Sequence, residues 1–418
     1  MTQPATLPVA DPVTAEVSRL YEAFPYPAQG VPTLRTGFDA RELLSRGALP
    51  RPEGAPLEIL DAGCGRGVGL VAQALTHPEA RVLGIDLSQA ALGDARASIE
   101  ARGLTNARLQ RVDLMTLEGL EVPGSGFDVV HSSGVVHHLS DPVTGLRKLG
   151  EALAPHGVLS LMVYGALGRT GIACVARTLA LWLDPEEPLD ARLAASRMLV
   201  DSLARPEAPG CPFDEAKRVP DVEFVDRYLH PHALEYDVPR LFDLIEDAGL
   251  RFLSWSEPER WSVERWIPAG PLRESVAALP DRERFALIEQ LARPAALECC
   301  LGRPENDPRR HLADDAWVGE TFATHPETRF LVETRNLWGA SRIESVAYAR
   351  GRNELVEVDD PRLGKAVWIL STQNRPFRGV DLIEALVAEG LTPPESLAVL
   401  QECLRRGLVY RPHGAEVD

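Results

Sequence analysis

The feature that most constrains the fold of this chain is a run of glycines at every second position from residue 63 to residue 69. An apolar segment over residues 57–60 precedes the run and ends at Asp61, and a helix-compatible segment over residues 68–75 follows it. Because glycine has no Cβ, the backbone can turn sharply there and a ligand can lie directly against it. The order of strand, glycine turn and helix predicts a nucleotide-binding turn at a helix N-terminus.

The spacing of these glycines excludes two common nucleotide-binding turns. The dinucleotide fingerprint G-x-G-x-x-G needs a glycine at its sixth position, which is Val68 counted from Gly63 and Leu70 counted from Gly65. The Gly-Lys-Ser/Thr ending of the phosphate-binding loop is absent from the segment as well. The pattern that remains is Asp-x-Gly-x-Gly-x-Gly, which begins at Asp61. It resembles motif I of the class I S-adenosylmethionine-dependent methyltransferases, in which the turn holds the amino-acid end of the cofactor.

The second expected strand, residues 81–86, ends at an acidic residue. Asp86 follows Asp61 by 25 residues, near the spacing of about 20 that is typical of a ribose-binding acid in nucleotide folds. The alternative role for this carboxylate is to cap the next helix. Ser88 is better placed for that role, directly before the helix expected over residues 90–102. We therefore predict that Asp86 binds the ribose hydroxyls.

The third expected strand, residues 107–112, ends at Asp113. The methyltransferase resemblance implies that an acid at this position lies near the adenine amino group, and a plain turn role stays open as the alternative. The full set of cofactor-binding residues that the resemblance implies is Asp61, Gly63, Gly65, Gly67, Asp86, Leu87, Asp113, Leu114 and Ser132.

The fourth expected strand, residues 127–131, runs into a turn of small residues and then into His137 and His138. This order is similar to the segment that follows the fourth strand in the methyltransferase family. Either histidine could act as a general base on a hydroxyl or amine nucleophile, since an unperturbed imidazole titrates near neutral pH. A helix-capping or core histidine is the alternative.

Strands alternate with helices as far as a fifth strand over residues 158–163, and a helix ending at Asp247 leads to a sixth over residues 250–255. Residues 296–303 could add a last strand that closes the sheet. The alternation predicts an α/β fold with a doubly wound, mostly parallel, Rossmann-like sheet and helices on both faces. Ligands of such sheets bind beyond the carboxyl ends of the strands, where the candidate residues gather.

Two further segments extend the resemblance. Residues 21–27 read YEAFPYP, which is similar to a segment that precedes the sheet in one bacterial branch of the family. A long insertion over residues 166–235, helical in part, follows the fifth strand. We expect a lid or substrate cap there, because long ordered insertions usually carry function, and an oligomer contact is the alternative. Tyr21, Tyr26 and Tyr164 are candidates to line a substrate pocket, against the alternative of packed aromatic residues.

The chain divides into three expected parts. Residues 1–50 form an N-terminal cap segment, residues 51–305 the methyltransferase domain with its insertion, and residues 306–418 a C-terminal accessory domain. Three short helices between residues 363 and 406 and a strand at 408–410 resemble a winged-helix or peptide-binding module. A packing or dimerisation role is the alternative, and a homodimer is left open.

Composition narrows the range of partners and locations. The 418 residues include 44 basic and 61 acidic residues, and the net charge of −17 argues against nucleic acid as a partner. No apolar run reaches the ~18 residues that span a bilayer, and the first 15 residues lack the features of a secretory signal. The six cysteines include no C-x-x-C pair, so we expect no metal site and a reducing cytoplasm.

These patterns imply an enzyme that uses S-adenosylmethionine and releases S-adenosylhomocysteine. The leading acceptor is an oxygen or nitrogen nucleophile of a small molecule, such as a specialised metabolite. A peptide or protein acceptor recruited by the C-terminal domain is the alternative. A regulator that binds S-adenosylmethionine without catalysis is the alternative from another class.

Overall fold

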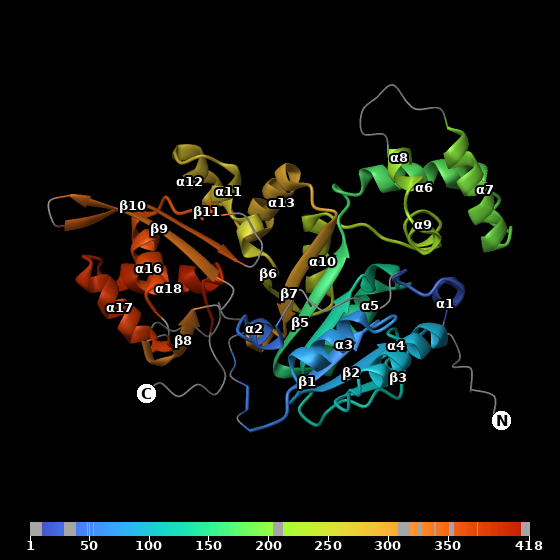
Figure 1. The fold of residues 1–418 in the computed structure, drawn as a ribbon, viewed down its shortest axis with the longest axis horizontal. Helices are drawn as coiled ribbons and strands as arrows, with labels where there is room; N and C mark the ends of the chain where they lie inside the picture. The colour runs from blue at the N-terminus through green and yellow to red at the C-terminus, as the bar shows by residue number, and fades with distance from the viewer. Residues whose placement is uncertain are drawn as a thin grey trace.

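A computed structural model of the protein describes residues 11–28, 39–47, 49, 51–52, 54–203, 212–307, 318–324, 328–337, 340–350, 355–373 and 375–410. Its centre is a seven-stranded sheet in the order β3-β2-β1-β4-β5-β7-β6 (Figure 1). The strands are β1 (Glu58–Ala62), β2 (Arg81–Asp86), β3 (Ala107–Arg111), β4 (Phe127–Ser133), β5 (Leu153–Tyr164), β6 (Arg251–Trp255) and β7 (Ala296–Gly302). Only the pairings of β7 with its two neighbours are antiparallel, so the predicted doubly wound, mostly parallel sheet is confirmed.

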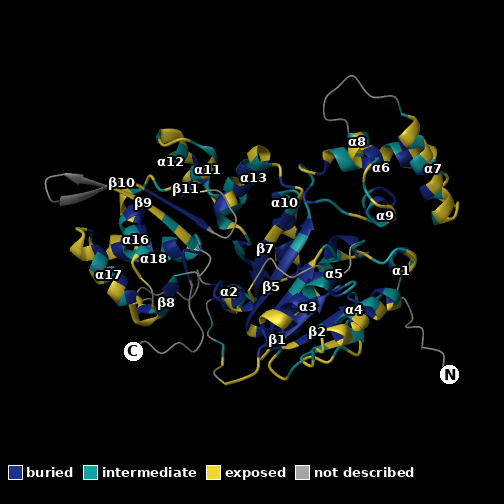
Figure 2. Cartoon of the chain, in the orientation of Figure 1, coloured by how far each residue is buried: buried dark blue, intermediate teal, exposed yellow. Residues whose placement is uncertain are grey.

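Helices cover both faces of this sheet. One face carries α2 (Ala40–Leu44), α3 (Val68–Thr76) and α4 (Gln89–Ala101), and the other carries α5 (Pro142–Ala152), α10 (Val238–Asp247) and α13 (Asp281–Ala292). Successive side chains of a strand point to opposite faces, so Ile59 packs into the first core and Leu60 into the second. The central strands are therefore buried on both sides, as Figure 2 shows by their dark colour. That burial explains why they read as apolar runs.

Strand β5 is longer than the sequence predicts. We expected the fifth strand over residues 158–163, yet β5 begins at Leu153. A register shift opposite Phe127 and Val129 of β4 takes up the extra residues. The last expected strand is confirmed as β7.

The insertion after β5 forms helices with a hydrophobic core of their own. These are α6 (Thr170–Trp182), α7 (Leu189–Ser202), α8 (Pro212–Ala216) and α9 (Asp221–Tyr228). The N-terminal helix α1 (Pro12–Ala23) contributes Leu20 to the same core, beside Val175 of α6 and Phe224 of α9. The N-terminal segment and the insertion are therefore packed together beyond the end of β5 (Figure 1).

The C-terminal part has a separate core and more strands than the sequence analysis anticipated. The expected elements are present as α16 (Pro361–Ser371), α17 (Gly379–Ala388), α18 (Pro393–Arg405) and β13 (Val409–Tyr410). The strands that were not anticipated are β8 (Thr321–Thr324), β9 (Thr328–Leu337), β10 (Ala340–Arg350), β11 (Val356–Glu357) and β12 (Phe377–Arg378). They form two three-stranded sheets, β11-β10-β9 and β12-β8-β13. In Figure 1 this part and the insertion lie at opposite ends of the molecule.

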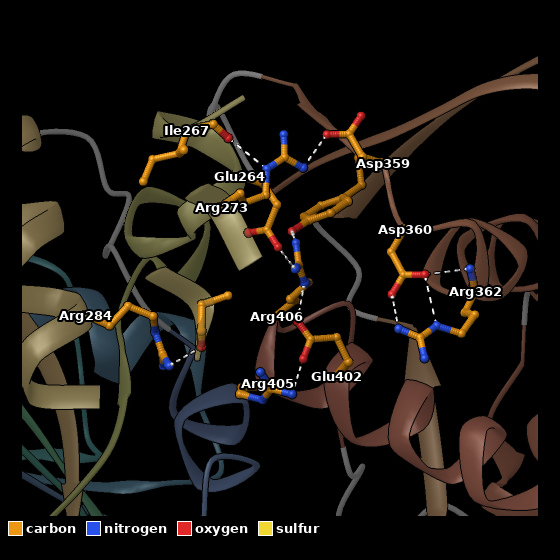
Figure 3. Close-up of polar contacts among 12 residues, drawn as sticks. Glu264, Ile267, Arg273, Arg284, Asp359, Asp360, Arg362, Glu402, Arg405 and Arg406 are labelled. Atoms are coloured by element: carbon orange, nitrogen blue, oxygen red, sulfur yellow. Dashed lines mark hydrogen bonds and ion pairs between the residues drawn. The ribbon is translucent and has the colours of Figure 1, made fainter. Parts of the chain in front are cut away.

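Ion pairs attach the C-terminal part to α11 (Val263–Trp266) and α12 (Pro271–Ala277), as Figure 3 shows. The guanidinium of Arg406 lies 2.7 Å from Glu264 of α11 and 2.6 Å from Glu402 of α18. Arg273 of α12 reaches Asp359 at 2.6 Å. Arg406 is well shielded from solvent, so the pair with Glu264 ties the two parts together more strongly than an exposed pair would. Within the parts of the chain that the structure describes, we find no helix both long and apolar enough to cross a membrane.

Candidate active site

The glycine turn after β1 has the backbone conformation that glycine permits. Gly63, Gly65 and Gly67 all have positive φ angles, of 80°, 51° and 81°. A Cβ on Gly65 would lie 2.9 Å from the carbonyl oxygen of Tyr26. The N-terminal segment therefore also approaches the bare backbone closely at this residue.

Asp86 fastens the glycine turn to the end of β2. Its Oδ2 accepts a hydrogen bond from the N–H of Gly65 at 2.8 Å, and its Oδ1 accepts one from the N–H of Ser88 at 2.9 Å. Burial raises the pKa of Asp86, and these two bonds oppose the rise. Ser88 caps α4, as predicted, by accepting from the N–H of Ala91. Each carboxylate oxygen of Asp86 keeps a lone pair for a further donor.

Three buried oxygens around the turn lack a hydrogen-bond partner among the described residues: Oδ2 of Asp61, Oδ2 of Asp113 and Oγ of Ser132. The other oxygen of Asp113 accepts from the N–H of Met115 at 2.8 Å. Burial, together with the charge of Asp86, raises the pKa of Asp61 to about 7. A buried polar atom without a partner costs roughly 1–3 kcal/mol, so a ligand with donor groups at these positions would be stabilised. Of the other predicted contacts, Leu87 and Leu114 follow the acids at the ends of β2 and β3, and Leu114 is buried.

The N-terminal segment lies across the glycine turn. Arg66 of the turn donates to the carbonyl oxygens of Pro27 and Ala28 at 2.8 and 3.1 Å. The carboxylate of Glu22 accepts from two backbone N–H groups at the start of α4. We call residues 21–28 the N-terminal strap, because these contacts hold the segment over the cofactor side of the sheet.

The three tyrosines predicted to line a substrate pocket gather around one buried carboxylate. Asp226 of α9 is 4% exposed, and its two oxygens accept from the hydroxyls of Tyr21 at 2.9 Å and Tyr164 at 3.2 Å. Burial raises the pKa of Asp226, and the two hydroxyls lower it. Burial and the charge of Asp226 raise the pKa of Tyr26 to about 12. We call Asp226 and these three tyrosines the acceptor cluster.

The two predicted catalytic histidines lie beside this cluster, on the 3₁₀ turn η1 (Val136–His138). His137 is fully buried, its ring centre is 3.9 Å from that of Tyr164, and neither ring nitrogen has a partner among the described residues. Nδ1 of His138 lies 2.9 Å from the carbonyl oxygen of His232. Because a carbonyl only accepts, this nitrogen carries the proton and Nε2 keeps a lone pair.

Burial keeps both histidines neutral. It lowers the pKa of His137 well below the usual value and that of His138 to about 4. A general base works best with a pKa near the working pH. The histidines therefore suit the acceptance of a hydrogen bond better than the full removal of a proton.

Sequence reasoning missed three residues of this region. Asp226 holds the tyrosine hydroxyls, His230 stacks on His138 with ring centres 3.9 Å apart, and the guanidinium of Arg169 lies 3.5 Å from the ring centre of Tyr164. Arg169 also lies 3.5 Å from the carboxylate of Glu235. Asp226 and His230 lie within the expected insertion over residues 166–235, but only the folding of that insertion places their side chains beside the ends of β4 and β5.

A seven-stranded sheet of this order, with a glycine turn after β1 and acids at the ends of β2 and β3, defines an S-adenosylmethionine-binding α/β fold. The family model described as a methyltransferase domain, Methyltransf_12, matches residues 60–159. The uncharacterized protein syc1184_c of Synechococcus sp. is 33% identical over 297 residues, which are 67% of this chain and 69% of that protein. The chain belongs to the class I S-adenosylmethionine-dependent methyltransferases. Its methyl donor is S-adenosylmethionine and its coproduct is S-adenosylhomocysteine.

Two other comparisons concern parts of the chain and the fold. The trans-aconitate 2-methyltransferase of Deinococcus radiodurans is 35% identical over 112 residues, which are 27% of this chain and 40% of that enzyme. The structure of PKMT2 from Rickettsia typhi in complex with AdoHcy covers 93% of this chain and 78% of its own, with a TM-score of 0.57 and 16% identity. The similarity to PKMT2 therefore extends the shared fold beyond residues 60–159, which the family model matches.

Proposed function

We propose that this methyltransferase methylates an oxygen or nitrogen nucleophile of a small molecule, such as a specialised metabolite, that binds at the acceptor cluster. The observation that carries the proposal is the meeting of Tyr21, Tyr164 and His137 around buried Asp226. These side chains come from the N-terminal strap, the end of β5, the segment after β4 and the insertion. All of them lie beyond the carboxyl ends of the strands, where ligands of this fold bind.

The cofactor side supports the same proposal. The unpartnered oxygens of Asp61 and Asp113 suit the ammonium and the adenine amino group of S-adenosylmethionine, and the free lone pairs of Asp86 suit the ribose hydroxyls. Ser132 offers a further hydroxyl at the end of β4. When bound, the cofactor supplies an intrinsically reactive sulfonium methyl group. The contribution of the protein is then mainly to align the acceptor, which can lower the barrier by ~7–11 kcal/mol.

The acceptor side has groups that can orient a nucleophile. Tyr21 and Tyr164 are held in place by Asp226, and the neutral imidazoles of His137 and His138 offer lone pairs to an O–H or N–H donor. Positioned acceptors of this kind fix the direction of the nucleophile's own lone pair. Arg169 packs on the ring of Tyr164 and lies close to Glu235.

A peptide or protein acceptor is the second candidate. The fixed attachment of the C-terminal part through Arg406 and Glu264 supports a recruiting role. Its position at the far end of the molecule from the insertion favours a small acceptor, because the C-terminal part contributes no side chain to the acceptor cluster described above (Figure 1). A cytoplasmic location and a homodimer remain predictions from the sequence.

One experiment separates these functions. The full-length protein is incubated with methyl-tritiated S-adenosylmethionine and a whole-cell extract of the source organism, and the products are separated by size. We expect the label in the small-molecule fraction. Label confined to protein would favour the second candidate, and cofactor binding without any label transfer would favour a regulator.

A further inference from the structure

We propose, on the basis of the function proposed above, that the acceptor is an amine that arrives as an ammonium ion, and that Asp226 recognises its charge. The buried carboxylate of Asp226, the hydroxyls of Tyr21 and Tyr164 and the neighbouring neutral imidazole of His137 lie close together. The negative charge of Asp226 and the free lone pairs beside it favour an amine over other nucleophiles.

The charge of Asp226 lacks a close partner within the described residues. Both of its hydrogen bonds come from uncharged tyrosines, and none of the ion pairs found there includes it. Of the two arginines that influence its pKa, Arg169 lies against Tyr164 and Glu235. Arg227 is held by Glu215 at 2.8 Å and by Glu223. A buried carboxylate is costly unless a cation compensates it, so a cationic ligand is favoured at this site.

The histidines add lone pairs and no charge. His137 is fully buried with both ring nitrogens unpartnered among the described residues, and Nε2 of His138 is unpartnered as well. His230 adds no free lone pair, because its Nδ1 accepts from the N–H of His232 at 3.1 Å and its Nε2 therefore carries the proton. Each neutral imidazole has one nitrogen that accepts, and each oxygen of Asp226 keeps a lone pair beyond its bond from a tyrosine. An ammonium group offers up to three N–H donors to such acceptors, whereas a hydroxyl offers one and a carboxylate none.

Methyl transfer to the amine needs only Asp226 as proton acceptor and S-adenosylmethionine as methyl donor. The ammonium ion loses one proton to the carboxylate of Asp226, whose pKa burial already raises. The freed nitrogen lone pair forms the N–C bond to the methyl group as the S–C bond breaks, and its electron pair stays on sulfur. The sulfonium becomes a neutral thioether, and the positive charge leaves on the methylated ammonium product. Asp226 then returns its proton to solvent.

The site of methylation in the wild-type product tests this inference. Full-length protein is incubated with S-adenosylmethionine carrying a CD₃ group and the small-molecule fraction of a cell extract, and fragmentation mass spectrometry locates the label. We expect CD₃ on nitrogen. Label on oxygen, carbon or sulfur of a small molecule would overturn the amine inference and leave the proposed function standing. Absence of any labelled small molecule would overturn both.

Asp226→Asn then tests the recognition group, with the labelled amine as the probe. The substitution keeps the shape and removes the charge, so we expect the KM for the amine to rise at least tenfold while the Kd for S-adenosylhomocysteine stays unchanged. The control is Asp221→Asn, which removes one charge from the same helix at an exposed position and should leave both constants unchanged. An unchanged KM in a folded Asp226→Asn protein would refute the role. If that variant does not fold, the position of the CD₃ label still decides whether the acceptor is an amine.

Discussion

Binding of S-adenosylhomocysteine should release a proton from Asp61. This carboxyl is buried beside Asp86, which raises its pKa to about 7, and its Oδ2 has no partner among the described residues. If the cofactor's ammonium group binds there, the charged form of Asp61 is stabilised and its pKa falls. The protein therefore gives up, on binding, the proton that Asp61 holds in the free state.

The size of this effect follows from the pKa. With a value of about 7, Asp61 holds ~0.8 proton per molecule at pH 6.5, and cofactor binding should release close to that amount. By linkage, the affinity for S-adenosylhomocysteine should rise about eightfold between pH 6.0 and pH 7.5. At the higher pH, most Asp61 carboxyls have already lost the proton that the ligand would otherwise displace. The ligand's own amino group, with a pKa of about 8, stays mostly protonated over this range.

Calorimetric titration at pH 6.5, in phosphate and in imidazole, measures the release directly. The two buffers differ in ionisation enthalpy, so the difference in binding heat gives the number of protons. Asp61→Asn is the matched control, since it keeps the shape and does not titrate. Equal heats in the two buffers for the wild-type protein, or the same proton release in the variant, would refute the assignment.

Three more predictions concern affinity and stability. Asp86→Ala should weaken S-adenosylhomocysteine binding by ~1–3 kcal/mol, because it removes the acceptor that fastens the turn, and calorimetry checks this value. Asp128→Asn should lower the free energy of unfolding by ~1–3 kcal/mol at pH 7. The bonds from His156, Glu58 and Arg51 lower the folded pKa of Asp128, so its contribution is full above about pH 4 and is lost as pH falls through that folded pKa. Urea unfolding at pH 7 and pH 3 should therefore show the deficit shrinking in acid. Arg406→Ala should destabilise the protein by ~3–5 kcal/mol, because it leaves Glu264 without its ion-pair partner and takes away one of the two arginines that pair with Glu402. Exposed Arg405→Ala should cost ~0–1 kcal/mol, and thermal denaturation of both variants checks the difference.

The central sheet could be predicted from the sequence because its strands are buried on both faces. Ile59 and Leu60 must both be apolar, since each packs into a different core. The glycine turn was visible for a similar reason, because positive φ angles leave few alternatives to glycine. Buried strands and glycine turns can therefore be recognised from residues that are adjacent in the sequence.

The acceptor cluster could be predicted only in part. Tyr21, Tyr164 and the histidines stood out by their place in the chain, but Asp226 is an ordinary acid in an amphipathic helix until the insertion folds over the sheet. The burial of Asp226 depends on contacts with residues that are far away in the sequence. The β9–β10 hairpin did leave a local signal, since Phe330, Leu331 and Val332 form a short apolar run.

The N-terminal strap has a consequence for how the enzyme is made. Its Arg66 contact spans 39 residues of sequence, and the bond from Tyr21 to Asp226 spans 205. Tyr21 is synthesised long before α9, so its bond to Asp226 forms only after α9 has been made. If the acceptor binds at the acceptor cluster, a ribosome-bound chain that has exposed only the glycine turn and its neighbouring strands should not yet methylate, because Asp226 has not emerged.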